Sequence, residues 1–360
     1  MNTLNATRVG LTTSILLFIG CAKEPVSAPS EARPSLVVSS MTRLDDAEWS
    51  EPVWLGPLIN SSARDFPGSL SPDGLSLYFQ SARADGLGGD DIWVSHRDCL
   101  TCQWKAPENL GDVINTSAFD GSPELSRDGC LLFFSSEGHG ALGSDIFVSH
   151  RAYTGDDFGW REPVNLGPNV NTAAHENNAS FLQLGNGNSE LYYITDMRGS
   201  GNEIFVAAMT RNGKVRGPGV PVDVLNDPDV PDQGPSIRGD GKELLFWGPP
   251  GTTRPGGLGL VDIWVSTRRS LHDHWSAPRN LGAPVNSAFA DLEPALTPDG
   301  HTLIFSSATG RDGLGLGGND MWMSTRKRAN EEIFAEKEHV RKHGHRCPLM
   351  RDDSDSHDGA

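Results

Sequence analysis

The stretch that decides the fold is DLEPALTPDGHTLIFSSATGRDGLGLGGNDMWMSTR, which runs from Asp291 to Arg326. Its turn, Pro298-Asp299-Gly300, suits a hairpin, because proline fixes φ at the first corner and glycine accepts a positive φ at the end. The apolar runs 303–305 and 321–323 have the length of strands and are bounded by turn residues. The stretch therefore predicts a strand, a tight turn, a second strand, a glycine-rich loop and a third strand.

The same pattern recurs along the chain in register. Four further copies cover residues 65–97, 120–151, 176–211 and 232–268. The copy at 176–211 diverges most, since its turn is the GNGN of residues 185–188. A period of roughly 55 to 60 residues is typical of a propeller or another repeat array.

A second shared phrase lies between the copies and contains proline. It reads WSEPVWLGPLIN from Trp49, WKAPENLGDVIN from Trp104, WREPVNLGPNVN from Trp160 and WSAPRNLGAPVN from Trp275, with a weaker version from Val215. Proline cannot donate a ladder hydrogen bond, so this strand belongs at a sheet edge. Three inner strands and one outer strand make a propeller blade, and the sequence predicts an all-β, five-bladed β-propeller.

The order of the phrases predicts how the ring closes. The repeat region begins with an outer-strand phrase at Trp49 and ends with a third strand at Arg326. The last unit therefore lacks an outer strand of its own. We expect residues 49–55 to supply it, so that the N-terminal strand closes the ring and leaves no open edge.

The SPDG-type turn, the aromatic strand and the DIW strand resemble the PD40, or WD40-like, repeats of TolB-type propellers. The resemblance covers residues 47 to 327. It implies the propeller fold and, by analogy with the assembly role of that family, a lipoprotein of the bacterial cell envelope.

The N-terminal residues read as a targeting segment. Residues 1–20 hold Arg8 and a short apolar core, and Phe18-Ile19-Gly20-Cys21 resembles the lipobox of bacterial lipoproteins. We expect Cys21 to be lipidated, although an ordinary signal peptide that contains a cysteine is the alternative. Because Ala22 is not acidic, the outer membrane is the expected location.

The remaining boundaries follow from composition. Residues 21–46 are rich in Pro, Ser, Ala and Glu and predict a flexible, lipid-anchored linker. Residues 47–327 form the predicted propeller, and residues 328–360 a charged, mostly disordered tail. The formal net charge of −17 argues against a nucleic-acid partner. The expected partners are an envelope protein or glycan, together with the membrane through the lipid.

The cysteines predict no cofactor. Cys99 and Cys102 lie close together in one loop and are candidates for a small local disulfide, a point that the sequence leaves open. A zinc site needs a second pair of ligands at suitable spacing, and the candidates are His343, His345 and Cys347.

An acidic residue opens each predicted inner strand: Asp65, Asp120, Glu176, Asp232 and Asp291. Inner strands line the central channel of a propeller, so the five carboxylates are weak candidates for a calcium site. The favoured interpretation is structural, with each acid accepting backbone N–H bonds from an adjacent loop. Beyond these weak calcium candidates, the sequence predicts no metal and no cofactor.

Two functions remain open at this point. The favoured prediction is a non-enzymatic, membrane-anchored scaffold that binds or assembles an envelope protein or glycan. The alternative is a five-bladed-propeller glycoside hydrolase that uses the channel carboxylates Asp65, Asp120 and Glu176. Hydrolysis needs an acid and a base made unlike by their surroundings. Because the repeated acids look equivalent in every unit, the sequence favours the scaffold and predicts no activity.

Overall fold

The computed structural model describes residues 48–199, 201–308, 310–326 and 344–348. The chain divides into a unit of residues 1–41 and a unit of residues 42–360, and every described residue belongs to the second unit. The predicted signal peptide, Cys21 and nearly all of the linker lie outside the described residues, as does most of the C-terminal tail. In the part of the chain that is described, no helix is long and apolar enough to cross a membrane.

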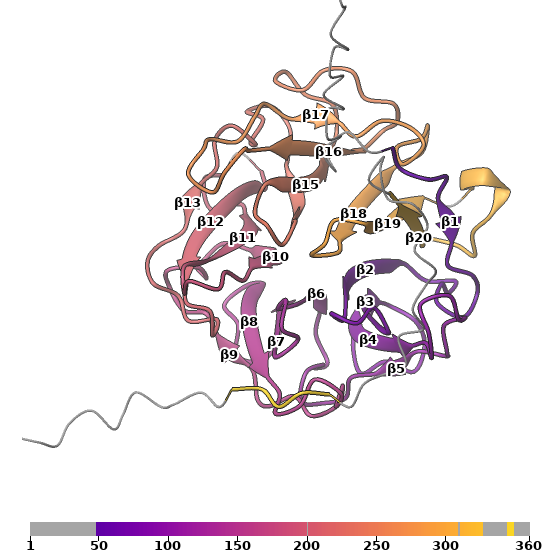
Figure 1. The fold of residues 1–360 in the computed structure, drawn as a ribbon, viewed down its shortest axis with the longest axis vertical. Coiled ribbons are helices and arrows are strands. Elements are labelled where there is room, and N and C mark those ends of the chain that lie inside the picture. Colours follow the sequence, from indigo (N-terminus) through magenta and orange to yellow (C-terminus); the bar gives the residue numbers. More distant parts are fainter. Residues whose placement is uncertain (1–47, 200, 309, 327–343, 349–360) are drawn as a thin grey trace, which may run out of the picture. The chain divides into compact units, whose positions relative to one another are not determined.

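The second unit is a ring of five four-stranded antiparallel sheets (Figure 1), and the fold prediction is confirmed. Blade 1 contains β2 (Asp65–Leu70), β3 (Ser76–Ser81), β4 (Asp91–His96) and β5 (Glu108–Asn109). Blade 2 contains β6 (Asp120–Leu125), β7 (Leu131–Ser136), β8 (Asp145–His150) and β9 (Val164–Asn165). Blade 3 contains β10 (Glu176–Leu182), β11 (Ser189–Thr195), β12 (Glu203–Met209) and β13 (Val220–Pro221).

The other two blades follow the same order. Blade 4 contains β14 (Gln233–Ile237), β15 (Glu243–Gly248), β16 (Asp262–Thr267) and β17 (Arg279–Asn280). Blade 5 contains β18 (Asp291–Leu296), β19 (Thr302–Ala308) and β20 (Asn319–Thr325), with a short 3-10 turn η2 (Arg311–Gly313) before β20. Its outer strand is β1 (Val53–Trp54), from the other end of the ring.

The ring closes as the order of the phrases predicted. Val53 pairs with Met323 and Trp54 pairs with Trp322, so the N-terminal strand completes blade 5. The side-chain amide of Asn60 reinforces this junction, since it donates to the carbonyl of Met321 at 3.1 Å and accepts from the N–H of Met321 at 2.7 Å. The closure prediction is therefore confirmed.

The core lies between neighbouring blades. Phe133 of blade 2 packs on Phe181 of blade 3 with ring centroids 4.7 Å apart. The third-strand residues Trp264 and Trp322 are almost completely buried. Each blade thus buries its faces against the next, and the apolar contacts run around the ring rather than through its centre.

The inner strands are irregular at one position near the channel. The pairing register of each inner strand with the second strand shifts by a bulge. At this bulge Ser122, Asn178 and Glu293 have φ near +50°, a conformation that is costly for residues other than glycine. The bulges place these residues, which differ from blade to blade, on the wall of the channel.

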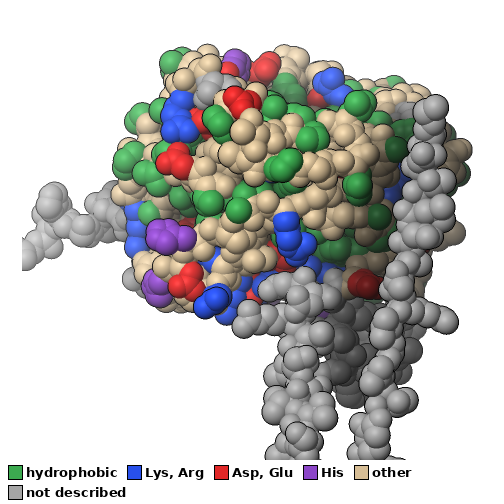
Figure 2. Space-filling view, turned by 90° about the horizontal axis from the view of Figure 1, so that it is seen from above, with side chains coloured by type: hydrophobic (Ala, Val, Ile, Leu, Met, Phe, Trp, Pro, Cys, Tyr) green, Lys and Arg blue, Asp and Glu red, His purple; other side chains and the backbone are tan. Residues whose placement is uncertain are grey.

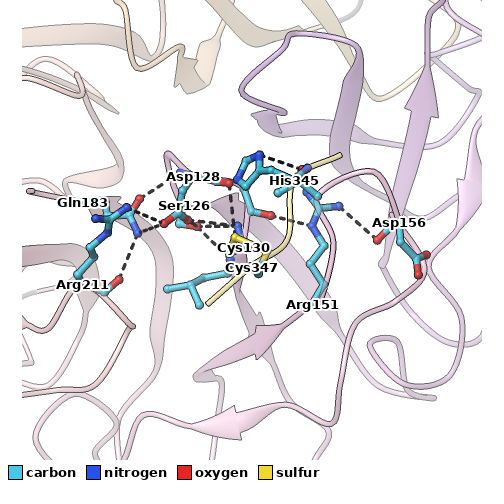
Figure 3. The surroundings of a disulfide bond; sticks show 12 residues. Ser126, Asp128, Cys130, Arg151, Asp156, Gln183, Arg211, His345 and Cys347 are labelled. Carbon is cyan, nitrogen blue, oxygen red and sulfur yellow. Dashed lines mark hydrogen bonds and ion pairs between the residues drawn. A yellow bond between two sulfur atoms is a disulfide. The ribbon is translucent and has the colours of Figure 1, made fainter. Parts of the chain in front are cut away.

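Two disulfides are present among the described residues. Cys99–Cys102 is the local bond that the sequence left open. Cys130–Cys347 joins the hairpin turn of blade 2 to the C-terminal segment 344–348, and it was not predicted (Figure 3). The same segment accepts a hydrogen bond from Thr154 N–H at His345 O (3.2 Å) and donates from Cys347 N–H to Ala152 O (2.8 Å).

Candidate functional site

The repeated inner acids are completely buried and are held within their own blades. Asp120 accepts hydrogen bonds from the N–H and the hydroxyl of Thr116 (2.5 and 2.8 Å) and from the hydroxyl of Ser136 (2.5 Å). Asp65, Glu176 and Asp291 have the same kind of partners, from the loop before the strand and from the end of the second strand.

In three blades an arginine also contacts the inner acid. Arg83 pairs with Asp65 at 2.7 Å, Arg311 pairs with Asp291 at 2.7 Å, and Arg254 pairs with Asp232. The five carboxylates therefore each have separate partners, and they do not meet around one ion. Within the described ranges, no group of three or more His, Cys, Asp or Glu side chains is arranged to hold a metal ion.

A cavity of about 340 Å³ opens at the end of the channel where the inner strands begin. We call it the channel mouth. Residues of all five blades line it: Arg64, Phe66, Gln80, Asp90, Phe119, Ser122, Glu137, Ser144, His175, Asn177, Asn178, Ile194, Asn202, Gln233 and Glu293. Its volume is in the lower part of the range of ligand pockets, about 300 to 1,000 Å³.

The channel mouth is built from positions at which the repeats differ. One such position lies two residues after the repeated inner acid of each blade. From blade 1 to blade 5 it holds Pro67, Ser122, Asn178, Gly234 and Glu293, so it is acidic only in blade 5. The residue before the third strand's first acid also varies, as Asp90, Ser144, Asn202, Val261 and Asn319. The sequence analysis considered only repeated residues and therefore missed this site. The positions at which one repeat differs from the others are the signal that could have found it.

Glu293 is the carboxyl with the most altered chemistry in the channel mouth. Burial raises its pKa to about 7, whereas the indole of Trp247 and the amide of Asn178 act in the opposite direction. Asn178 donates to Glu293 Oε2 at 2.8 Å. At neutral pH a substantial fraction of Glu293 therefore carries a proton, and it carries that proton next to an open cavity.

The wall of the channel mouth also contains an anchored arginine. Arg64, which is half exposed, binds Asp90 at 2.6 Å, and the side-chain amide of Gln80 donates to Asp90 at 2.9 Å. The hydrogen bond to Asp90 raises the pKa of Arg64. Gln80 is fixed in turn, because it accepts a hydrogen bond from the N–H of Ser122 at 3.1 Å. The guanidinium is thus held in place at the edge of the cavity.

A third carboxylate, Glu137, follows β7 and is exposed to solvent at the channel mouth. Glu137 and Glu293 therefore line one cavity in different environments, since Glu137 is exposed and Glu293 is partly buried. A partly buried carboxyl that keeps its proton can act as an acid, and an exposed carboxylate can accept a proton from water. The arrangement has the components for acid–base hydrolysis.

No protein-family model and no curated protein sequence matches the chain. Among solved structures, it resembles a thermostable family-43 glycoside hydrolase at 14% identity, with 83% of this chain and 98% of that chain covered and a TM-score of 0.51. It also resembles a family-43 endo-arabinanase from Bacillus licheniformis at 12% identity, with 74% and 94% covered and a TM-score of 0.50. A putative TolB from Agrobacterium tumefaciens matches at 20% identity, with 69% and 71% covered and a TM-score of 0.42.

These similarities contradict the predicted scaffold function, and they do not establish the predicted PD40 family. Many of the most similar structures are five-bladed glycoside hydrolases, which contradicts the predicted non-enzymatic scaffold and favours the alternative. The prediction compared only the repeated acids, whereas Glu293 and Glu137 stand at positions that the repeat does not share. At these identities the similarities establish the propeller fold alone, and a TM-score of 0.42 is too low to assign the PD40 family.

Proposed function

We propose that this chain is a glycoside hydrolase whose active site is the channel mouth. The observation that carries the proposal is the pair of unlike carboxyls in one cavity: Glu293, partly buried and with its pKa raised to about 7, and Glu137, exposed to water. Glycoside hydrolysis requires such a pair, because one carboxyl must give a proton while the other accepts one. The family-43 hydrolases that share the propeller fold are consistent with this reaction class.

In the proposed reaction, Glu293 protonates the glycosidic oxygen as the bond from that oxygen to the anomeric carbon breaks. Water adds its oxygen to the anomeric carbon, and its proton passes to Glu137. The balance is one bond cleaved, one water consumed and one proton moved from Glu293 to Glu137, after which the solvent restores both groups. The raised pKa of Glu293 keeps its proton available at neutral pH.

The other residues of the channel mouth suit a neutral sugar. The side chains of Asn177, Asn202 and Gln233 offer amide donors and acceptors for hydroxyl groups. Phe66 and Phe119 offer apolar surface for the carbon face of a sugar ring. Arg64 is held by Asp90 and can donate to a ring or hydroxyl oxygen from a fixed position. A few placed polar groups on a partly apolar wall are typical of ligand pockets.

The repeated inner acids support this site in the proposal and take no part in the chemistry. Asp65, Asp120 and Glu176, the residues of the sequence-based alternative, use their oxygens within their own blades. We also propose that the repeats belong to the PD40 kind, on the strength of the five copies in register.

The test is a panel of aryl glycosides and oligosaccharides incubated with purified protein. We expect sugar release that falls by at least ~100-fold in Glu293→Gln and in Glu137→Gln, the range for loss of acid–base catalysis. Glu162→Gln, at an exposed position in the loop before β9, is the matched control and should retain activity. Release that survives both site variants, or no release from any glycoside, would overturn the proposal.

We further propose that Cys21 is acylated and anchors the domain in the bacterial envelope. The support is the FIGC motif and the linker composition of residues 21–46, which lie outside the described residues. Mass spectrometry of the protein from a membrane extract should find a lipid mass on Cys21. A chain cleaved at another residue, or an unmodified Cys21, would remove this proposal.

A further inference from the structure

One indole N–H near the channel is buried without a hydrogen-bond partner. It belongs to Trp247 of β15, and among the residues that the structure describes, Trp54, Trp160 and Trp322 share this property. What distinguishes Trp247 is the carboxyl of Glu293 beside it. A buried donor without a partner is costly, so its place next to a carboxyl that exchanges a proton points to a role. The side of the ring above β17 offers no such signal, since its hydrophobic side chains are scattered among polar ones (Figure 2).

Gly234 of β14 shows how closely the indole approaches Glu293. It occupies the repeat position that Asn178 and Glu293 hold in blades 3 and 5, and its φ of +53° is similar to theirs. A Cβ at Gly234 would lie 2.5 Å from Trp247 Nε1 and 3.0 Å from Glu293 Oε2. Both atoms therefore lie against the same face of one glycine, in space that the side chain of any other residue would fill.

The strand pairing places Trp247 next to the channel mouth. Trp247 pairs with Gln233, which lines that cavity. Its ring packs on the apolar cluster between blades 4 and 5, which limits its rotation. The indole is specific to blade 4, because the corresponding residues of the other blades are Gln80, Ser135, Ile194 and Ser306. Like Glu293, Trp247 thus stands at a position where one repeat departs from the others.

The donors around Glu293 are uncharged. Asn178 donates to Glu293 Oε2 at 2.8 Å, and the indole of Trp247 likewise favours the ionised form of the carboxyl. A carboxylate offers about four acceptor sites, so there is room for both donors. A neighbouring cation would keep Glu293 ionised, whereas uncharged donors let the carboxyl hold its proton and still stabilise the carboxylate after the proton has left.

We propose that Trp247 is a positioning residue of the hydrolase reaction. Its indole N–H donates a hydrogen bond to the Glu293 carboxylate that forms when the proton passes to the glycosidic oxygen, and Gly234 leaves the space in which the two groups meet. Trp247 keeps its own proton throughout. This inference rests on the proposed hydrolase activity and names a residue that acts through its acid.

The first test is Trp247→Phe, which removes the N–H and keeps an aromatic ring in the core. We expect the alkaline limb of the kcat/KM profile to move upward by about one pH unit, the effect of losing one hydrogen bond to a charged group. Activity should fall at least ~10-fold more on alkyl glycosides than on nitrophenyl glycosides, because a good leaving group needs less help from an acid. Trp54→Phe is the matched control, since its indole N–H is also buried and unpartnered but lies near Asp320.

The second test is Gly234→Ala, which places a methyl group between the indole and the carboxyl. We expect activity to fall ~10- to 100-fold, the range for a small displacement of a catalytic group. Gly56→Ala controls for backbone strain, because Gly56 has φ of +82° and an added carbon there has no atom within 4 Å. It should retain activity. Equal losses in the two alanine variants would contradict the role of Gly234.

A titration without substrate separates this inference from the hydrolase proposal. Carbon NMR of protein with labelled glutamate carboxyls follows Glu293, and Glu293→Gln identifies its signal. The other ionisable groups of the two cavities that Glu293 lines stay the same in the variants: Arg64, Asp90, Glu124, Glu137 and His175. A midpoint that is higher in Trp247→Phe than in Trp54→Phe, with no hydrolysis by the unmodified protein, would support the indole contact and overturn the hydrolase.

Hydrolysis by the unmodified protein, with the same pH profile and the same Glu293 titration in Trp247→Phe, would overturn the inference and leave the hydrolase standing. Equal shifts in Trp247→Phe and Trp54→Phe would also overturn it, because they would report a general change in the fold.

Discussion

The side-chain amide of Asn178 in blade 3 donates a hydrogen bond to the carboxyl of Glu293 in blade 5 at 2.8 Å. The two residues occupy the same repeat position and both have φ near +50°. Glu293 is partly buried, and desolvation raises its pKa to about 7. This contact across the channel therefore connects two bulges of the ring and adjusts the proton affinity of the proposed acid.

Replacing Asn178 by Ala should move the pH dependence of hydrolysis upward. The amide favours the ionised form of Glu293, so its loss raises the pKa of that carboxyl above about 7. A general acid works only while protonated, and the alkaline limb of the kcat/KM profile should move to higher pH. The control is Asn177→Ala, since Asn177 lines the same cavity but accepts from Ser144. The same shift in both variants, or none in Asn178→Ala, would contradict this role.

Glu124 should control how the stability of the domain changes with pH. Glu124 and Glu293 line a second, smaller cavity in the channel. Burial raises the pKa of Glu124 from 4.5 to about 8, against hydrogen bonds from Phe181 and Ser180. The folded state therefore holds this proton more tightly than the unfolded state. The resulting stabilisation is complete below pH 4.5 and is lost as the pH rises through about 8.

Glu124→Gln should reduce this loss by up to about 1.4 kcal/mol for each pH unit between those limits. Urea unfolding at pH 5, 6.5 and 8 should show the variant gaining on the unmodified protein as the pH rises. Glu162→Gln is exposed and should follow the unmodified protein. A difference between Glu124→Gln and the unmodified protein that stays constant with pH would show that Glu124 does not titrate in this range.

Asp120→Asn should destabilise the propeller by about 1 to 3 kcal/mol, because a buried acceptor then faces donors that it no longer matches. Asp120 accepts from Thr116 and Ser136, and none of its surface is exposed. Denaturant unfolding measures the effect, and Asp112→Asn, at an exposed loop position, should change little. A large calcium-dependent rise in Tm that Asp120→Asn removes would instead support the weak calcium candidates.

The long-range disulfide should stabilise the domain more than the local one. Cys130 and Cys347 are 217 residues apart, whereas Cys99 and Cys102 are 3 apart. In the chain-entropy description the longer loop restricts the unfolded chain more, by up to about 5 kcal/mol. Cys130→Ser/Cys347→Ser should therefore melt well below Cys99→Ser/Cys102→Ser under oxidising conditions. Equal melting temperatures for the two double variants would contradict this expectation.

The sequence by itself determined the number of blades, their strand order and the closure of the ring. Each of these depends on local chemistry: a turn that needs Pro and Gly, short apolar strands bounded by turn residues, and a proline-bearing edge strand. The same signals occur in five copies, so the divergent GNGN turn at 185–188 could be placed from its neighbours. That residues 49–55 complete the last blade followed from the order of the phrases, whereas the register of Val53 with Met323 came from the structure.

Only the tertiary structure showed the candidate site and the second disulfide. Glu137 and Glu293 come from distant repeats and share a cavity because the ring brings blades 2 and 5 to one opening. The proton affinity of Glu293 depends on burial and on Trp247 and Asn178, which belong to other blades. Cys130 and Cys347 likewise meet only after the C-terminal segment reaches blade 2. The repeat determines what is common to the blades, whereas reactivity depends on neighbours that each residue acquires on folding.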